Sequence, residues 1–205
     1  MRKPILFFIK RLKRPIFTTS EVSLISGKSL SATVQALNVL EQQGLIFKVY
    51  RGVWAEVGSK DISPYKVVPY LFLKQRVYVS FISALHLHGM IEQIPQVVTI
   101  ASTGHTKVIH TNLGVFSLHR IAADFFSGFN WYQDRGDFLI AEPEKALVDS
   151  LYISSCKKKQ FGYFPELHFS KNFSFSKLKK WVKKIPSVRS RSYVEKKVEL
   201  LLKNN

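Results

Sequence analysis

The sequence predicts an α+β protein, in which an N-terminal winged helix-turn-helix precedes a mixed α/β C-terminal domain with a basic helical tail. Residues 14–58 follow the order short helix, tight turn, longer helix and β-hairpin, which is the order of a winged helix-turn-helix. Short strand patterns and helix patterns mix through residues 59–156, and the helical pattern of residues 157–205 is rich in lysine. We therefore expect one domain at residues 1–58 and a second at residues 59–205.

The chain opens with the basic segment MRKPILFFIKRLKRP, which we interpret as the first helix of the N-terminal domain. Its apolar run is too short for a signal peptide, and no small-residue cleavage site follows it. A basic amphipathic helix on a membrane surface is the alternative interpretation. The side chains expected on the buried side of this helix are Ile5, Leu6, Phe8, Ile9 and Leu12.

Hydroxyl side chains mark the start of the first helix of the helix-turn-helix. Thr18, Thr19 and Ser20 can each cap a helix. Glu21 places a negative charge in the first turn, where the helix dipole favours it. Gly27 can adopt the positive φ that commonly ends a helix, so we expect a short helix between these residues.

The second helix of the motif is expected to begin at a cap formed by Ser29 or Ser31 and to end at Gly44. At 3.6 residues per turn, its core stripe should contain Leu30, Val34 and Leu37. Small and amide side chains on the opposite side suit a surface that enters the major groove of DNA, because Gln can pair with adenine and Ser with bases or phosphate. The residues on that side are Ser31, Ala32, Gln35, Val39 and Gln42.

A β-hairpin is expected after Gly44, because the segments LIFKVY and VWAEV are rich in β-branched and aromatic residues. Gly52 permits the tight turn between the two strands. Lys48 and Arg51 would lie on or near this wing, where a cation can contact phosphate or the minor groove. A helix–helix–hairpin unit that binds only protein is the alternative interpretation.

The net charge of +17 indicates a polyanionic partner. Residues 1–58 hold nine Lys and Arg against three Asp and Glu, residues 59–156 hold eight of each kind, and residues 157–205 hold fourteen against three. Nucleic acid is the simplest explanation for basic segments at both ends of a neutral centre. The alternative for the tail is that its lysines only aid solubility.

The amino-acid composition also indicates the cellular compartment in which we expect the protein. The single cysteine, Cys156, allows no disulfide within the chain, so we expect a reducing, cytoplasmic environment. No apolar run approaches the roughly 18 residues that can span a membrane. We therefore expect no membrane partner.

The second domain is expected to open with a helix at Ser63-Pro64, since proline suits the first helical position. The segment RVYVSFISALHLHGM predicts a short strand and a helix that is capped by Ser80 and ends at Gly89. Carboxylates in the first turn and proline at its start predict a helix at residues 142–152. Further strands are expected at residues 96–101, 107–110, 115–120 and 138–141, and basic helices from about residue 174 to the end.

No pattern in the sequence points to catalysis. His86 and His88 stand two residues apart on a predicted helix, so they lie on different faces and make a poor metal pair. His88, next to Gly89, is better explained as a helix-end histidine bonded to the backbone. Glu142 and Glu144 are better explained as helix-start carboxylates than as a catalytic pair. We therefore expect no enzymatic activity, no metal and no cofactor.

Three stretches of the sequence, in this order, resemble one protein family. They are the predicted winged helix ending in KVYRGVWAEV, the segment YVSFISALHLHGMI followed by QVVTIA, and GVFSLHRI followed by FLIAEPEKALVDSLY. Together they resemble the AbiEi family of bacterial antitoxins, predicted transcriptional regulators of viral defence systems, over about residues 15–155. The stretch AEPEKALVDSLY is the most specific of them.

The resemblance implies a DNA-binding repressor that autoregulates a type IV toxin–antitoxin operon. Its partners would be double-stranded operator DNA and a nucleotidyltransferase toxin, which the C-terminal domain counteracts without a stable complex. At matching positions, the resemblance places Ser29, Ser31, Thr33 and Gln35 on the recognition helix and Lys48 and Arg51 on the wing. Signature positions of the C-terminal domain, which we explain physically as helix caps, a helix end and a helix start, are Ser80, Ser83, His88, Pro143, Glu144, Lys145 and Asp149.

The predicted recognition helix departs from many DNA-reading helices because it carries no Arg or Lys. More of the operator affinity would then come from Lys28, the wing and the basic N-terminal helix. Two alternatives remain open, namely an orphan winged-helix regulator and a protein or RNA interaction module without antitoxin activity. In the RNA alternative, Trp181 and the lysines of the tail would provide stacking and phosphate contacts.

Overall fold

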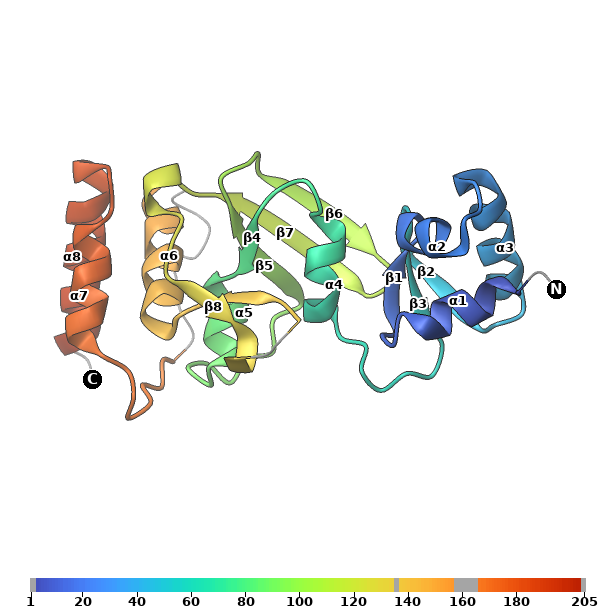
Figure 1. Cartoon of the computed structure of the whole chain (residues 1–205). Helices are drawn as coiled ribbons and strands as arrows, with labels where there is room; N and C mark the ends of the chain where they lie inside the picture. The colour runs from blue at the N-terminus through green and yellow to red at the C-terminus, as the bar shows by residue number, and fades with distance from the viewer. Residues whose placement is uncertain (1–2, 135–136, 157–165, 204–205) are drawn as a thin grey trace. The chain divides into compact units, whose positions relative to one another are not determined.

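The computed structural model describes residues 3–134, 137–156 and 166–203. Helices and strands mix throughout, which confirms the predicted α+β class (Figure 1). Residues 157–165, which belong to the predicted basic tail, lie outside the described residues. Among the helices that are described, none combines the length and the apolar character needed to cross a membrane.

The chain divides into two compact units. The first comprises residues 1–73 and 110–114, and the second comprises residues 74–109 and 115–205. The first unit includes the helix α4 (Pro64–Leu71), which we expected in the second domain. As predicted, proline occupies the first position of this helix.

In the first unit, helices pack against a three-stranded antiparallel sheet. The strands are β1 (Ile16–Thr18), β2 (Ile46–Tyr50) and β3 (Val53–Glu56), and β3 lies in the centre of the order β1-β3-β2. Strands β2 and β3 form the predicted hairpin, with a register shift near its turn. The helices that precede the hairpin are α1 (Ile5–Arg11), α2 (Thr19–Ser26) and α3 (Leu30–Gln42).

Capping residues set the bounds of α2 and α3, as the sequence predicts. The Thr18 hydroxyl accepts a hydrogen bond from the Glu21 N–H at 3.2 Å, and the Glu21 carboxylate accepts one from the Thr18 N–H at 2.7 Å, which makes a capping box. Gly27, with φ of 66°, ends α2. Of the two candidate caps for α3, Ser29 has this role, because its hydroxyl accepts a hydrogen bond from the Ala32 N–H at 3.3 Å.

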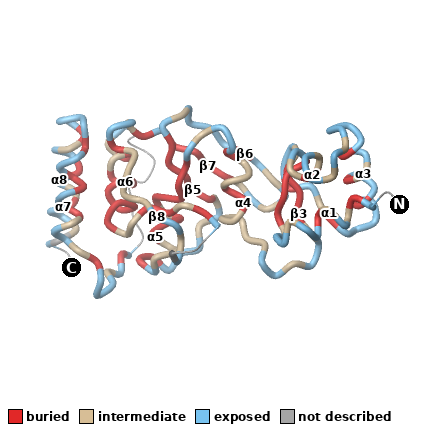
Figure 2. The backbone as a smooth tube through the Cα atoms, viewed as in Figure 1, coloured by how far each residue is buried: buried red, intermediate tan, exposed pale blue. Residues whose placement is uncertain are grey.

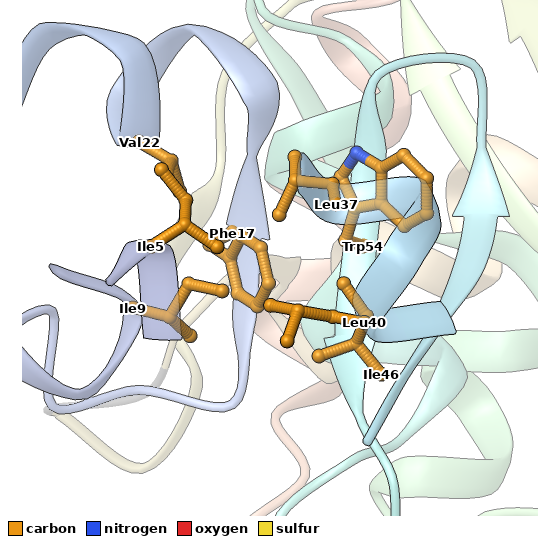
Figure 3. Close-up of a cluster of buried hydrophobic side chains, with 8 residues drawn as sticks. All are labelled: Ile5, Ile9, Phe17, Val22, Leu37, Leu40, Ile46 and Trp54. Carbon is orange, nitrogen blue, oxygen red and sulfur yellow. The ribbon is translucent and has the colours of Figure 1, made fainter. Parts of the chain in front are cut away.

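Buried side chains from the three N-terminal helices and the sheet form one hydrophobic cluster, the core of the first unit (Figure 3). The indole N–H of Trp54 donates to the Thr19 hydroxyl at 2.9 Å, so the polar atom of this large side chain is satisfied inside the core. Packing of this kind supplies most of the stability of helices as short as these. The members of the cluster are Ile5, Ile9, Phe17, Val22, Leu37, Leu40, Ile46 and Trp54.

The buried face of α3 differs from the predicted stripe. Leu37 is buried as expected, but Leu30 and Val34 are 57% and 38% exposed. Thr33 and Leu40 take the other buried positions. Thr33 can be buried because its hydroxyl donates to a backbone carbonyl one turn earlier at 2.9 Å, which satisfies its polar atom. The prediction for the two exposed residues was wrong because a count of apolar residues alone overlooks a hydrogen-bonded threonine.

The second unit is built on a six-stranded mixed sheet, from which only residues 110–114 are grouped with the first unit. Its strands are β4 (Val77–Val79), β5 (Val97–Ser102), β6 (Lys107–Thr111), β7 (Gly114–Arg120), β8 (Phe129–Trp131) and β9 (Leu139–Ala141). They lie in the order β6-β7-β5-β4-β9-β8. The pairs β4–β9 and β5–β7 are parallel, whereas β4–β5 and β8–β9 are antiparallel. The sequence predicts all of these strands except β8.

Helices of the second unit gather around α6. They are α5 (Phe81–Leu87), α6 (Pro143–Cys156), α7 (Phe175–Lys183) and α8 (Val188–Lys203), with two short 3₁₀ turns, η1 (Ala123–Phe125) and η2 (Tyr132–Asp134). Helix α6 packs against α5, α7 and α8 and is buried over most of its length, whereas α7 and α8 each keep an exposed side (Figure 2). Helix α6 therefore connects α5 to the C-terminal helices.

Candidate functional site

The exposed side of α3 carries a continuous line of polar side chains. Ser31, Gln35, Asn38 and Gln42 recur at intervals of four, three and four residues, so they lie along one line of the helix. All four are exposed, on the side opposite the face that is buried in the core. We call these four residues the polar stripe.

Asn38 is the member of the polar stripe that sequence reasoning missed. The signal was present, because Asn38 stands three residues after Gln35 and four before Gln42, which the helical period already places together. The carboxamides of these three residues make no hydrogen bond to any other residue that the structure describes. Their donors and acceptors are therefore available to a ligand, and a carboxamide can pair bidentately with adenine.

The start of α3 is suited to binding an anion. Its first turn contains no acidic residue, and the backbone N–H groups there form the positive end of the helix dipole. Lys28 immediately precedes the cap, Ser29, and is half-buried, with its carbonyl accepting a hydrogen bond from the Ser23 hydroxyl at 2.7 Å. The hydroxyl oxygens of Ser29 and Ser31 lie 3.2 Å apart. A cation, two hydroxyl groups and free N–H groups together favour a phosphate.

Ala32 and Thr33 lie on different sides of α3. Ala32 is exposed, as expected for a residue that contacts a ligand. Thr33 is fully buried, and its hydroxyl donates to the Ser29 carbonyl at 2.9 Å. The expectation that Thr33 contacts DNA is therefore wrong, because its side chain lies on the core side of the helix.

The β2–β3 hairpin gives its two predicted cations different surroundings. Arg51 is exposed in the turn between the strands and makes no ion pair with another described residue. The next residue, Gly52, has φ of 75°, and its carbonyl accepts a hydrogen bond from the Thr19 N–H at 2.9 Å, which fixes the turn against the start of α2. Lys48 lies within β2, where its ammonium is 5.4 Å from the centroid of the Trp54 ring. Both cations are exposed, and Lys48 differs from Arg51 in lying beside an aromatic ring.

Acidic partners neutralise part of the basic N-terminal segment. The Lys10 ammonium pairs with the Glu56 carboxylate at 2.7 Å, and Arg14 pairs with Glu21. Arg11 is exposed and makes no ion pair with a described residue. The N-terminal helix thus offers a polyanion less free charge than its sequence indicates.

In the second unit, three of the predicted signature residues converge on one carboxylate. Lys145 forms an ion pair with Asp149, one helical turn away on α6. The Ser80 hydroxyl donates to Asp149 Oδ2 at 2.7 Å, and the Tyr78 hydroxyl donates to the same oxygen at 3.0 Å. All four residues are 0% exposed. We call them the buried Asp149 cluster; Tyr78 is the member that sequence reasoning missed.

Aromatic rings enclose the ammonium of Lys145, which lies 3.6 Å from the centroid of Phe125 and 5.6 Å from that of Trp181. Burial lowers the pKa of Lys145 below its usual value, although the charge of Asp149 opposes this shift. Burial and the same negative charge raise the pKa of Tyr78 well above its usual value. The buried Asp149 cluster thus combines the Lys145–Asp149 pair with a tyrosine that keeps its proton to a higher pH than usual. The hydrogen bond from Tyr78 to Asp149 joins β4 to α6. The cluster is closed to solvent, so it does not present these groups to a ligand.

Ser83 and His88 have separate structural partners. The Ser83 hydroxyl donates to the Val97 carbonyl at 3.2 Å and accepts a hydrogen bond from the Thr99 N–H at 2.8 Å, which fastens α5 to β5. His88 ends α5, and its Nε2 donates to the Ala141 carbonyl at 2.7 Å. The prediction of a helix-end histidine bonded to the backbone is therefore confirmed.

Pro143 and Glu144 open α6, as predicted for helix-start residues. The Glu144 carboxylate also accepts a hydrogen bond from the Ser174 N–H at 2.8 Å, and its second oxygen lies 3.8 Å from the Lys177 ammonium. The same ammonium lies 3.0 Å from the Glu142 carboxylate. These contacts attach the start of α6 to the start of α7.

A pocket of about 460 Å³ lies beside the start of α6. Its walls include Trp131, His88, Glu142 and Pro143, so two signature residues reach this surface. No member of the buried Asp149 cluster lines it. The pocket and the cluster are therefore separate features of the second unit.

The C-terminal helices expose lysines and two aromatic residues, Phe175 and Tyr193, which are 38% and 36% exposed. Trp181 is 8% exposed, with its ring 6.4 Å from that of Phe125, so the expectation that it stacks on RNA bases is wrong. The exposed cations along α7 and at its end are Lys179, Lys180, Lys183 and Lys184. This surface offers phosphate contacts, and Trp181 does not contribute a ring for base stacking.

A scan against models of known protein families finds no match for this sequence, and a search of curated proteins finds none. In the first unit, the accessible polar groups of interest are the polar stripe, the start of α3 and Arg51. In the second unit, the buried Asp149 cluster and the lysines of α7 are the distinctive groups.

Proposed function

We propose that residues 1–58 form a winged helix-turn-helix and that the protein is a transcriptional repressor of double-stranded DNA. The polar stripe is the observation that carries this proposal. Four exposed polar side chains, three of them carboxamides without a described partner, lie on α3, which follows α2 after a short turn. In helix-turn-helix proteins, the second helix enters the major groove and reads base edges.

Groups next to the polar stripe would position the helix on the DNA backbone. Lys28, Ser29 and the free N–H groups at the start of α3 would contact one phosphate region. Arg51, in the turn of the following hairpin, would contact a second region or the minor groove. This division between positioning and reading is typical of sequence-specific DNA binding.

We further propose that the repressor is an antitoxin, encoded with a nucleotidyltransferase toxin that it counteracts without a stable complex. The resemblance of the stretch AEPEKALVDSLY to the AbiEi family supports this part. In this proposal the second unit provides the antitoxin activity, and the buried Asp149 cluster maintains its fold. The protein would act in the cytoplasm without catalysis, metal or cofactor.

Removing the charge of Arg51 tests the proposed DNA face. Arg51→Ala should weaken binding to a duplex and reduce the slope of log affinity against log salt by about 0.9 for each phosphate that Arg51 neutralises. Lys60→Ala is the control, because it removes one exposed positive charge from the loop after β3. Fluorescence anisotropy at several salt concentrations measures both slopes. Equal effects of the two substitutions would contradict a DNA face at this hairpin.

The lysines of α7 favour a second candidate function, the binding of structured RNA. A double variant, Lys179→Gln with Lys183→Gln, removes two exposed charges from this helix. Titrating the wild type and this variant with duplex DNA and with a folded RNA at the same salt separates the candidates. An RNA preference that persists at about 150 mM salt and is abolished in the variant would favour the RNA function over the repressor.

A further inference from the structure

We infer that α3 selects an A·T-rich half-site, an inference that rests on the proposed DNA-binding function. Each base pair presents its own pattern of hydrogen-bonding groups and methyl groups in the major groove. The exposed side chains of α3 can therefore be matched with these patterns one by one. They fit adenine and thymine, and they lack the groups that read guanine and cytosine.

The carboxamides of the polar stripe match adenine. Gln35, Asn38 and Gln42 each offer one acceptor and two donors, which pair with adenine N6 and N7. At 1.5 Å of rise per residue, the first two lie about 4.5 Å apart along the helix axis, close to the roughly 3.4 Å between base pairs. Neighbouring carboxamides can therefore reach neighbouring base pairs. None of them makes a hydrogen bond to another described residue that would compete with a base.

Aliphatic side chains on both sides of the polar stripe match thymine. Val34 is 38% exposed and Val39 is 50% exposed, and Ala32 is exposed near Val39. The C5-methyl group of thymine projects into the major groove, where Ala and other apolar side chains contact it. Scattered apolar residues on a surface need no explanation, but these three flank a line of adenine-pairing groups. Their water-exposed methyl groups would become buried against thymine.

Side chains that read G·C pairs are missing from α3. The helix contains no Arg or Lys, and these are the commonest readers of guanine in the major groove. A carboxylate can accept a hydrogen bond from cytosine N4, but the single carboxylate of α3, Glu41, already accepts one from the Lys48 N–H at 3.0 Å. The helix therefore has no cation that reads guanine, and one oxygen of its single carboxylate is already bound within the first unit.

The hairpin carries a cation that an A·T-rich site would also accommodate. Runs of A·T pairs narrow the minor groove and strengthen its negative potential, which attracts an arginine side chain. Arg51 is exposed at the hairpin turn without an ion-pair partner among the described residues. An A·T-rich site would thus suit both α3 and the hairpin.

Selection of duplexes from a randomised library by the full-length protein, at one fixed salt concentration, tests the inference. The bound pool should contain a block of consecutive A·T pairs, and replacing one of them by G·C should weaken binding about 5- to 150-fold. Two modified duplexes then probe single groups. Deoxyuridine in place of thymidine removes the methyl group, and 7-deazaadenine removes N7, so each should weaken binding of the wild type.

A charge-matched pair of variants tests whether the polar stripe makes the selection. Gln35→Arg should move the preference at one position from adenine to guanine, because Arg pairs with guanine O6 and N7. Gln43→Arg adds the same charge one residue beyond α3, at an exposed position outside the polar stripe. It should strengthen binding to all duplexes without changing the selected sequence.

The outcomes separate this inference from the function on which it rests. Sequence-selective binding to G·C-rich duplexes, or an unchanged preference in Gln35→Arg, would overturn the A·T assignment and leave the repressor in place. Failure to bind any duplex would overturn the proposed function itself, and the inference with it.

Discussion

Lys145 has unfavourable surroundings for a charged residue, because its side chain is fully buried. Its charge is balanced by the single carboxylate of Asp149, and the rings of Phe125 and Trp181 lie around it. A buried ion pair adds little net stability compared with apolar side chains of the same size, but breaking it leaves an uncompensated charge. A substitution that removes only one member of this pair should therefore be strongly destabilising.

We expect Lys145→Met to lower the free energy of unfolding by about 3–5 kcal/mol, since the charge of Asp149 would remain buried without its partner. Urea denaturation measures this change. The double variant Lys145→Met with Asp149→Asn should recover part of this stability, because it removes both charges. Lys10→Met, which breaks the exposed ion pair with Glu56, should cost less than about 1 kcal/mol and serves as the control. A similar cost for the two single variants would contradict the buried pair.

Tyr78 predicts a pH dependence of stability at alkaline pH. Its pKa is raised in the folded state, so it keeps its proton where an unfolded tyrosine, with a pKa near 10, has released it. The folded state then binds more protons than the unfolded state, so stability falls as pH rises above about 10. Tyr78→Phe removes this effect. The stability difference between wild type and variant should therefore shrink as pH rises from about 8 to about 10.5.

Chemical denaturation of both proteins across this pH range measures the difference. Tyr193→Phe is the control, because it removes a tyrosine hydroxyl from a residue of α8 that is 36% exposed and lies outside the buried Asp149 cluster. A difference for Tyr78→Phe that does not change with pH would show that the tyrosine hydroxyl is not held beside Asp149.

Single elements of the first unit end where their capping residues predict, which allows a direct test at α2. Of the three candidate caps, Thr18 forms the capping box, whereas Ser20 is exposed inside the helix. Thr18→Ala should lower the free energy of unfolding by about 1 kcal/mol. Ser20→Ala should change it by less than about 0.5 kcal/mol. Thermal or urea unfolding of the two variants separates them, and an equal decrease would mean that the cap lies elsewhere.

The attachment of α7 depends on a glycine. A Cβ on Gly128 would lie 2.4 Å from a ring carbon of Trp181, whereas a Cβ on Gly89 would meet nothing within 4 Å. The two glycines have φ of 79° and 68°, so alanine causes similar backbone strain at both. We expect Gly128→Ala to be the more destabilising change and to speed hydrogen exchange of the α7 amides. Equal effects of the two substitutions would contradict the packing of Trp181 on this glycine.

Local signals predicted the helix bounds well and the buried faces less well. Hydroxyl caps and positive-φ glycines act within a few residues, so Thr18, Gly27 and Ser29 could be recognised in the sequence. The buried face of α3 was misjudged because Thr33 satisfies its own hydroxyl within the helix. Which residues of α3 are buried depends on how the helix is rotated about its axis against the core. A count of apolar residues in the sequence does not give this rotation.

Long-range contacts explain most of what the sequence could not show at the candidate sites. Lys145 and Asp149 are one helical turn apart, so their ion pair could have been predicted from the sequence. Tyr78 and Ser80 stand 71 and 69 positions before Asp149 in the sequence, so their convergence needs the pairing of β4 with β9 ahead of α6. Asn38 is different, because the helical period alone could have identified it.

For the whole molecule, the sequence predicted the α+β class, and the structure adds how its charge is used. The basic segments at both ends contain exposed cations, such as Arg11, Arg51 and Lys183. Others are neutralised locally, as in the pair of Lys10 with Glu56. Fewer cations are therefore free to contact nucleic acid than the 31 Lys and Arg of the sequence, and the net charge of +17 already includes this neutralisation.

The central claim is that the protein recognises a specific operator. Binding of the full-length chain to the DNA immediately upstream of its own reading frame, at a low and a near-physiological salt concentration, tests this claim most directly. A scrambled duplex of the same composition is the control. The proposed repressor should prefer the upstream duplex at both salt concentrations, because base contacts persist when phosphate contacts are screened. Equal binding to both duplexes that disappears at the higher salt would contradict the claim.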